Sequence, residues 1–181
     1  PHTCRLALLF LIAFATSASN AALAQIAPDP LSPRFLPKSS AGGVKLADNV
    51  AAVWITDSLV KVLQSGAAGS AQSVQISAAR NEFESFQVHV RAGDNPVTMS
   101  VSVSDFINTQ NSSLQILNAT NVVVHREAYQ NITTLSDDNG TLGMTPDPLI
   151  PMKDPYFNEA RNAFPFAVAA NAVQSAWIDV W

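Results

Sequence analysis

Two segments in the middle of the chain alternate between apolar and polar residues with a period of two. Every second residue is apolar from Phe86 to Val90, and again from Val97 to Val103. Successive side chains of a strand point to opposite faces, so each segment is predicted to be a strand with one buried face. Gly, Asn and Pro occur in residues 93–96 between them, and we expect the two strands to pair as an antiparallel hairpin.

Shorter apolar runs predict further strands at residues 53–55, 114–117, 122–125 and 176–181. Asp57 is expected to cap a brief helical turn that continues through Leu59, Val62 and Leu63. No amphipathic pattern of ordinary helix length follows residue 24. The sequence therefore predicts an all-β fold, an antiparallel β-sandwich or an open antiparallel sheet.

Residues 1–24 have the three parts of a secretory signal peptide. Arg5 precedes an unbroken apolar run from Leu6 to Ala15, and the segment closes on Ala22-Leu23-Ala24. The run is too short for a membrane-spanning helix, which needs about 20 apolar residues. A buried N-terminal helix is the alternative, but no polar face interrupts the run. We predict cleavage after Ala24 and a secreted, periplasmic or extracellular protein without a membrane span.

Residues 25–49 are predicted to be a linker, and residues 50–181 the β-sandwich domain. The linker is rich in Pro, Ser and Gly, and proline fixes φ and removes a backbone donor, which favours an extended segment. The sequence begins with Pro1 rather than methionine, and it stops at Trp181 within an alternating segment. We therefore expect a fragment whose sandwich is incomplete at its C-terminus.

Composition and charge limit the possible partners. The chain has 14 acidic and 10 basic residues and a formal net charge of −4, whereas binding to nucleic acid requires clustered Lys and Arg. A hydrophobic fraction of 48% with 13% charged residues can build a core. The single cysteine, Cys4, lies in the predicted signal peptide, so the mature domain is expected to depend on its core without a disulfide.

Glu84 has the same strand phase as Phe86, which directs its carboxylate toward the apolar face. An ionised carboxylate there needs a basic partner, for which Arg80, Arg126 and Arg161 are candidates. We expect a structural ion pair between Glu84 and Arg80 or Arg161.

Glu82 and Glu84 are two residues apart and on a strand would share one face at about 7 Å, near the spacing of paired carboxylates in glycosidases. Phe83 and Phe86, three residues apart, require a bulge or turn near Glu84 that would disturb this spacing. A polar strand start with one structural salt bridge explains the two acids better. No catalytic residue is therefore assigned to the chain.

Residues 144–166 combine five prolines with aromatic and aliphatic residues, which predicts a long ordered loop that packs on the sandwich or on a neighbouring domain. Asp154, Tyr156, Glu159 and Arg161 lie close together in this loop. They suit a sugar or a cation, although anchoring the loop's own backbone is the commoner role of such a cluster. Tyr156 is one candidate ligand-binding residue.

Trp177 and Trp181 fall on one face of the last predicted strand, with Asp179 between them. If they are exposed, they form a stacking platform for sugar rings; if they are buried, they belong to the core or to a domain interface. Burial is the favoured interpretation, and both remain candidate ligand-binding residues.

The sequence offers no metal site and no cofactor motif. His89 and His125 stand singly on predicted strands, where an outward-facing polar residue is expected rather than a zinc ligand. The segment 137–140 resembles a calcium loop only loosely, because Leu135 stands where a ligand is required, and a turn is expected instead. Glycine-rich nucleotide motifs and the G-x-S-x-G motif are absent.

Three blocks of the sequence carry a family resemblance: residues 80–91 (RNEFESFQVHVR), residues 148–152 (PLIPM), and the segment from Arg161-Asn-Ala-Phe-Pro-Phe to the final Trp-Ile-Asp-Val-Trp. Over residues 50–181 the chain resembles the N-terminal domain of secreted glycoside-hydrolase-like proteins. That family is largely of unknown function and is related to the N-acetyl-β-galactosaminidases. The resemblance implies a β-sandwich followed by a (β/α)8 barrel.

In the related galactosaminidases an adjacent Asp-Glu pair on the barrel acts together with the acetamido group of the substrate. The chain contains no Asp-Glu dipeptide, so the resemblance places no catalytic residue here. We expect a non-catalytic β-sandwich whose partner is a downstream catalytic domain of the same polypeptide. The parent protein is a candidate N-acetylhexosaminidase-like enzyme, whereas this fragment is not expected to be an enzyme.

Two other classes remain open. One is a carbohydrate-recognition module that binds glycans through Trp177, Trp181 or Tyr156. The other is a structural cell-surface domain without a ligand.

Overall fold

The computed structural model describes residues 48–79, 81–108, 111 and 113–181, together with the backbone of four short strands before residue 48. It consists of antiparallel strands and one four-residue helix, α1 (Asn118–Asn121). The all-β, antiparallel class predicted from the alternation is therefore confirmed. The predicted cleavage site after Ala24, most of the predicted linker, and Arg80 lie outside the described residues.

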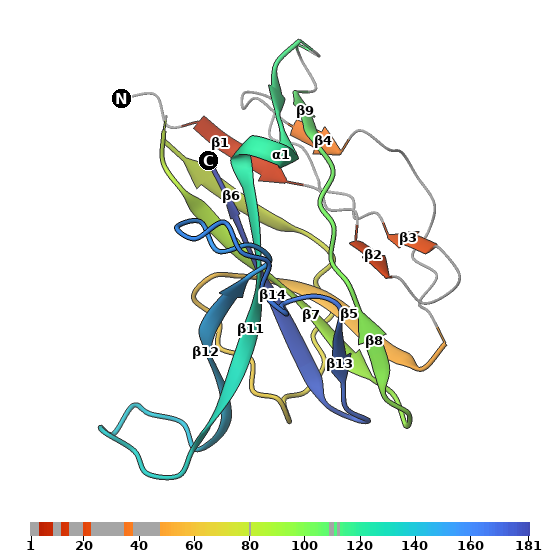
Figure 1. Ribbon diagram of the computed structural model, residues 1–181, viewed down its shortest axis with the longest axis vertical. Coiled ribbons are helices and arrows are strands. Elements are labelled where there is room, and N and C mark those ends of the chain that lie inside the picture. The colour runs from red at the N-terminus through yellow and green to blue at the C-terminus, as the bar shows by residue number, and fades with distance from the viewer. Residues whose placement is uncertain are drawn as a thin grey trace.

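The main layer is a five-stranded antiparallel sheet with the strand order β12-β11-β14-β7-β5 (Figure 1). Its strands are β5 (Val50–Asp57), β7 (Glu84–Ala92), β11 (Val122–Ile132), β12 (Gly143–Pro151) and β14 (Val173–Val180). No two sheet neighbours except β11 and β12 are consecutive along the chain. Most of the sheet is therefore held by contacts between distant segments.

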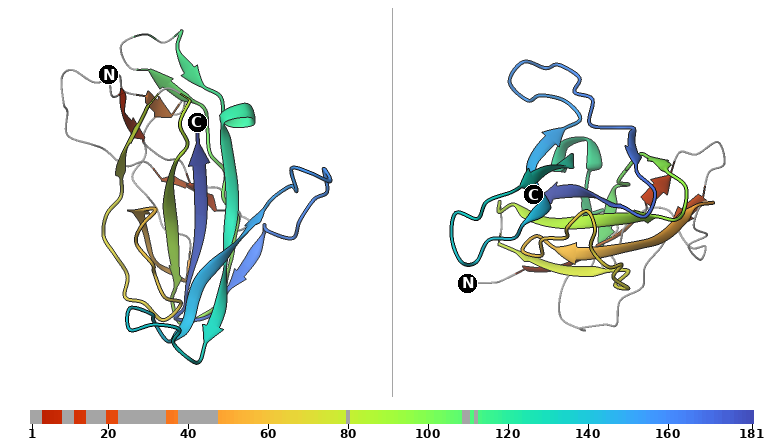
Figure 2. Two further views of the ribbon diagram at one scale, coloured as in Figure 1. Left: turned by 90° about the vertical axis from the view of Figure 1, so that its left-hand side faces the viewer. Right: turned by 90° about the horizontal axis from the view of Figure 1, so that it is seen from below.

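Several short sheets complete the fold, and three of them form a second layer over one face of the main sheet (Figure 2). These three are β8 (Val97–Met99) with β13 (Phe166–Val168), β6 (Val74–Ala78) with β1 (Cys4–Leu8), and β9 (Phe106–Asn108) with β10 (Gln115–Ile116) and β4 (Phe35–Pro37). A further pair is β2 (Ile12–Phe14) with β3 (Asn20–Ala22).

The hydrophobic core lies between the two layers. Phe86 and Val88 of β7 lie opposite Ile178 and Ala176 of β14, and all four side chains are buried on the same face of the main sheet. The second layer covers them with apolar residues such as Met99, Phe106 and Phe166. The alternation that predicted one apolar face of residues 86–90 thus corresponds to the real core face.

The predicted hairpin between residues 86–91 and 97–104 is wrong. Both segments begin as strands, but β7 pairs with β14 and β5 in the main sheet, while β8 pairs with β13 in the second layer. The intervening residues 93–96 cross from one layer to the other. Alternation specifies which face of a strand is apolar, but it does not specify the neighbouring strand.

Of the bulge or turn expected near Glu84, the bulge is absent, and a turn precedes the strand instead: the N–H of Glu82 donates to the carbonyl of Ala79 at 3.3 Å. β7 begins at Glu84, which pairs regularly with Val180, and Phe83 precedes the strand. Phe83 is 63% exposed and packs against Trp181 in a tilted arrangement, with ring centroids 4.9 Å apart. Phe83 and Phe86 therefore never need to share a strand face.

The helical turn expected after Asp57 does not form. Asp57 instead accepts a hydrogen bond from the backbone N–H of Leu59 at 2.8 Å, and residues 58–73 continue as an irregular segment. We refer to residues 58–73 as the covering loop, because it lies over the face of the main sheet that points away from the core. Its backbone bonds to that sheet, which a helix would prevent.

Candidate functional site

The outward face of the main sheet is polar, yet much of it is buried beneath the covering loop. Side chains on the sheet donate hydrogen bonds to carbonyls of the covering loop: Gln87 to Val60, Tyr129 to Val62, and Arg91 to Gly66. Gln87 also donates to the carbonyl of Asp57, the last residue of β5. Backbone bonds from Gln64 to Met144 and from Val173 to Gln64 add to these contacts. The polar residues of this face thus provide hydrogen-bond partners for backbone groups of a loop that has no regular secondary structure.

A chain of hydrogen bonds runs across this buried face. His89 Nε2 lies 2.8 Å from the hydroxyl of Thr56, and His89 Nδ1 lies 2.7 Å from the hydroxyl of Ser175. The Ser175 hydroxyl also lies 3.2 Å from the hydroxyl of Tyr129. His89 was expected to face outward as a polar residue; it does so, but Trp54 stacks on its ring and the side chain is buried.

Burial shifts the pKa values of the ionisable groups in this layer. Burial lowers the pKa of His89 to about 4 and raises the pKa of Tyr129 to about 12. Burial also raises the pKa of Glu127 to about 7, although a hydrogen bond with Ser175 acts in the opposite direction. At neutral pH His89 is uncharged, and the carboxyl of Glu127 is near the middle of its titration.

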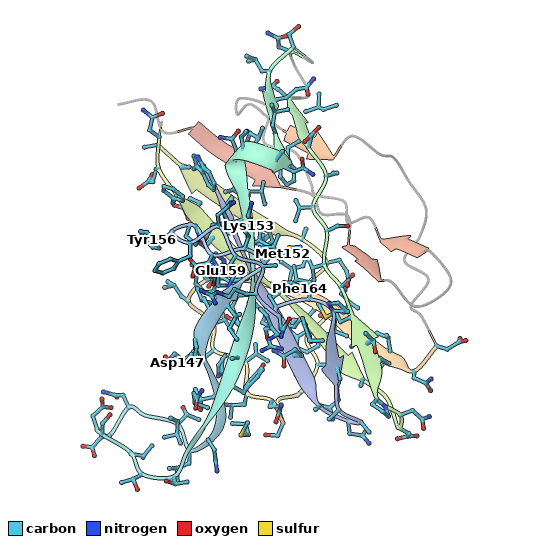
Figure 3. All side chains as sticks on the ribbon, viewed as in Figure 1. Asp147, Met152, Lys153, Tyr156, Glu159 and Phe164 are labelled. Carbon is cyan, nitrogen blue, oxygen red and sulfur yellow. The ribbon has the colours of Figure 1, made fainter. Side chains whose placement is uncertain are left out.

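The candidate site is a pocket of about 250 Å³ at the edge of the covering loop. One wall is the loop itself, the floor is the outward face of β7, β11 and β14, and the far wall is β12. The lining residues that carry polar or aromatic groups are Ser58, Lys61, Gln87, Glu127, Asp147 and Trp177. Figure 3 shows Asp147 on β12, on the outer side of the molecule.

A bulge in β12 forms the outer wall of this pocket. Glu127 of β11 lies opposite Leu149, whereas Tyr129 lies opposite Pro146, so Asp147 and Pro148 together face the single residue Ala128. Proline lacks a backbone N–H and cannot continue the ladder at this point. The extra residue in β12 places Asp147 and Leu149, two residues apart, along the wall of the pocket.

Two of the lining side chains are deeply buried and carry an oxygen without a hydrogen-bond partner. Gln87 is 2% exposed and Glu127 is 4% exposed. Gln87 Oε1 and Glu127 Oε2 have no partner, although both residues use their other polar atoms. Because buried polar atoms are nearly always paired in folded proteins, two unpaired acceptors in one pocket mark it as a place where a donor is needed.

Trp177 is the predicted ligand-binding residue that the structure places in this pocket. It is half-buried, and its indole N–H donates to Asp179 Oδ1 at 2.7 Å. The same carboxylate accepts a hydrogen bond from the hydroxyl of Ser85 and lies 3.6 Å from His125 Nδ1. Burial lowers the pKa of His125, and the charge of Asp179 opposes that shift.

The other two predicted ligand-binding residues lie elsewhere. Trp181 follows the end of β14 and packs against Phe83, so it does not share a platform with Trp177. Tyr156 is 91% exposed on the loop of residues 152–165. The structure therefore does not bring Tyr156, Trp177 and Trp181 together in one site.

The loop of residues 152–165 is fixed by its own polar side chains. Asp154 accepts hydrogen bonds from the backbone N–H groups of Tyr156 and Phe157 at 2.9 and 3.0 Å, and it pairs with Arg161 at 2.5 Å. Arg161 also pairs with Glu159 at 3.2 Å. The bond from Arg161, and then those from the two N–H groups, lower the pKa of Asp154 to about 2. This cluster anchors the loop backbone.

Replacing Asp154 with alanine is expected to loosen the loop without unfolding the domain. The substitution removes both backbone bonds and the Arg161 partner, whereas the loop meets the hydrophobic core at its far end, at Ala163 and Phe164. We expect faster amide exchange at Tyr156 and Phe157 and faster proteolysis within residues 152–165, with little change in the thermal midpoint. Glu159→Ala, which removes one exposed ion pair, is the control and should leave exchange almost unchanged.

The predicted ion pair of Glu84 does not form with Arg161, which pairs with Asp154 and Glu159 instead. Arg126 lies over the ring of Phe166, with its guanidinium carbon 5.8 Å from the ring centre. Arg80 lies outside the described residues, so a pair between Arg80 and Glu84 stays a prediction. Glu82 is exposed and accepts a hydrogen bond from the backbone N–H of Ala79 at 2.6 Å, a structural role at the strand entrance.

A larger and more apolar pocket of about 370 Å³ opens on the core side of β11. It lies between Val101 and Val103 on one side and Val122 and Val124 on the other, with Met152 and Lys153 at its edge. Its walls are mostly aliphatic, and it contains none of the unpaired acceptors described above. We therefore take the pocket around Glu127, rather than this one, as the candidate binding site.

Sequence reasoning found Trp177 but missed Gln87, Glu127, Asp147 and Lys61. On the sequence, Gln87 and Glu127 look like ordinary polar positions of alternating strands. Nothing local indicates that the covering loop buries them. Only the pairing of β7, β14 and β11, which are distant in sequence, brings these residues together.

Among the described residues, no group of three or more His, Cys, Asp or Glu side chains has the spacing of a metal site. Within the same part of the chain, no helix has the length and apolarity needed to cross a membrane. A scan against models of known protein families finds no match. A search of curated proteins likewise finds no similar sequence.

Proposed function

We propose that the chain is a non-catalytic β-sandwich of an exported glycoside-hydrolase-like protein and that it supports a downstream (β/α)8 catalytic barrel of the same polypeptide. The observation that carries this proposal is an exposed apolar surface on the loop of residues 152–165. Tyr156 is 91% exposed and Phe157 is 73% exposed, and Met152 adds exposed apolar area. We call these three residues the loop surface.

The loop surface suits a docking role because it is both apolar and ordered. The loop projects from the side of the sandwich (Figure 2), and Asp154 and Arg161 hold its backbone. Large aromatic side chains that solvent surrounds favour burial against a partner. An ordered loop loses little conformational entropy when it docks, so more of the burial energy remains as affinity.

The arrangement of the ionisable groups supports a non-catalytic role. The hydrogen-bonded residues His89 and Ser175 are fully buried under the covering loop, where a substrate cannot reach them. The paired acids considered from the sequence, Glu82 and Glu84, line neither of the two pockets described above. A supporting module needs surface complementarity rather than such groups.

The proposal is tested by expressing the region that follows residue 181 in the parent reading frame as a separate polypeptide. We expect it to contain a barrel with an adjacent Asp-Glu pair and to bind the present chain. The double substitution Tyr156→Ser and Phe157→Ser should weaken this binding at least about tenfold, as loss of central aromatic anchors does. Leu142→Ser, an exposed apolar residue on the β11–β12 connection, should leave it unchanged.

The same material provides an activity assay. The chain alone is expected to hydrolyse no aryl N-acetylhexosaminide, with or without Glu82→Gln and Glu84→Gln. Turnover by the chain alone, or binding of the barrel that is indifferent to the double substitution, would contradict the proposed function.

A further inference from the structure

The floor of the pocket around Glu127 offers hydrogen-bond acceptors without matching donors. The amide nitrogen of Gln87 already donates to the carbonyls of Asp57 and Val60, at 3.0 and 2.8 Å. Both amide hydrogens are used, so the side chain is held with its oxygen as the remaining polar atom, and that oxygen is unpaired. A group that pairs with Gln87 Oε1 must therefore be a hydrogen-bond donor.

Glu127 presents the same requirement from β11, on the other side of β14. Its carboxyl interacts with the hydroxyl of Ser175 on one side, while Oε2 has no partner. None of the described Lys, Arg or His side chains forms an ion pair with Glu127. A buried carboxylate without a cationic partner is costly, and a bound cation would remove that cost.

The remaining lining residues favour a positive ligand. Asp147 adds a second carboxylate at the outer wall, and Trp177 adds an indole ring, to which cations are attracted. Lys61 is the single basic residue of the lining, and it is exposed. A hydroxyl group would bring an acceptor as well as a donor into this acceptor-rich floor, whereas an ammonium group brings three donors and no acceptor.

We propose that the pocket formed by Gln87, Glu127, Asp147 and Trp177 binds a primary alkylammonium group. Neither Gln87 Oε1 nor Glu127 Oε2 is open to solvent in the structure, so the lining side chains must shift slightly for the ammonium to donate to both oxygens. Its alkyl chain then lies along Val60, Pro146 and Leu149. A volume of about 250 Å³ accommodates an ammonium head with several carbons. A free amine and the lysine side chain of a partner protein present the same group. This site is separate from the loop surface and does not depend on the proposed function.

Binding should become stronger as the pH rises through neutrality. Glu127 has a pKa of about 7, so its ionised fraction rises from about one tenth at pH 6 to about nine tenths at pH 8, while an alkylammonium stays charged. The other ionisable groups that face or approach Glu127 are Lys61 on the covering loop, Asp147 on β12, Tyr129 and His125 on β11, and His89 on β7. His89 and Tyr129 remain uncharged over this range.

The experiment is a titration of the isotopically labelled protein with n-butylammonium chloride at constant ionic strength, followed by amide and indole NMR signals. We expect saturable shifts at Lys61, Glu127 and the indole N–H of Trp177, and affinity about five- to tenfold higher at pH 8 than at pH 6. n-Butanol, the neutral isostere, should bind at least about tenfold more weakly. Nα-acetyl-lysine methylamide tests the lysine side chain as the source of the ammonium.

Three variants identify the groups responsible. Glu127→Gln keeps the shape of the side chain and should weaken butylammonium binding at least about tenfold while removing its pH dependence. Lys61→Ala removes a like charge from an exposed position and should strengthen binding about two- to threefold. Asp94→Asn, an exposed carboxylate between β7 and β8 that does not line the pocket, should change nothing.

Two results would overturn the inference. The first is equal affinity for butanol and butylammonium, which would show an apolar pocket without cation recognition. The second is the absence of saturable shifts at the lining residues in both the original chain and Lys61→Ala, because the exposed alanine substitution is expected to leave the fold intact.

Discussion

Replacing Phe86 with alanine is expected to lower the free energy of unfolding by about 3–5 kcal/mol, the range found when large aromatic residues are truncated in a well-packed core. Phe86 is fully buried in the middle of the core face, opposite Ile178 of β14 and Asp57 of β5. Strands on both sides fix its position, so the surrounding side chains have little freedom to fill the cavity. Urea unfolding followed by tryptophan fluorescence measures the loss.

Phe83 provides a matched control three residues away. It is the same residue type, but it lies outside β7, is 63% exposed and contacts the ring of Trp181. Phe83→Ala is therefore expected to cost less than about 1 kcal/mol. Equal losses for the two variants would show that the face assigned to Phe86 is not the core.

The contrast between these two phenylalanines shows what the sequence could determine. The alternation of residues 86–90 identified the buried face of β7 correctly, because it depends only on the geometry of a single strand. The alternation itself does not indicate that Phe83 lies before the strand begins. A position outside a strand has no fixed phase, and the expectation of a bulge arose from treating Phe83 as part of the strand.

Strand partners were harder to predict than strands. β7 and β8 were expected to pair because they are adjacent in the sequence, yet each pairs with a strand more than 60 residues away. Two apolar faces from consecutive strands can meet within one sheet or across two layers. The choice depends on the summed packing of all strands, which no local pattern contains.

The candidate site could be predicted only in part for the same reason. Trp177 was identified as an aromatic residue on a strand face, and it does line the pocket. The role of Glu127 depends on two segments that are distant from it in the sequence: the covering loop, which buries it, and β12, whose bulge forms the outer wall of the pocket. A polar residue on an alternating strand is normally solvated, so its sequence environment could not reveal an unpaired carboxyl oxygen.

The free energy of unfolding is expected to vary little between pH 7 and pH 4.5 as far as His89 and Glu127 determine it, because two opposing titrations cancel. The unfolded chain protonates histidine near pH 6.5, but His89 in the folded protein has a pKa of about 4. Its contribution to stability is therefore full above pH 6.5 and is lost as the pH falls toward 4. With about 1.4 kcal/mol for each pKa unit, the loss is about 3 kcal/mol.

Glu127 acts with the opposite sign. Its pKa is raised from 4.5 to about 7, so the folded protein binds a proton that the unfolded chain has already released. Its contribution is full below pH 4.5 and is lost as the pH rises through 7, again by about 3 kcal/mol. On acidification, Glu127 gains stability over almost the same range in which His89 loses it.

Glu127→Gln removes one of the two titrations and should expose the other. As the pH is lowered from 7 to 4, the unfolding free energy of the variant is expected to fall by about 3 kcal/mol relative to that of the original chain. Other groups that titrate here, including His125 with its lowered pKa, are present in both proteins and cancel in the difference.

Urea unfolding curves at half-unit pH intervals measure this difference. A difference between variant and original chain that stays constant with pH would show that Glu127 is solvated in the folded state. A difference of the opposite sign would show instead that a cation neutralises its carboxylate, because a paired carboxylate would have a lowered pKa and would stabilise the fold as the pH rises. We expect this change of sign when the measurement is repeated with saturating butylammonium, because the proposed ligand places a positive charge beside the carboxylate of Glu127.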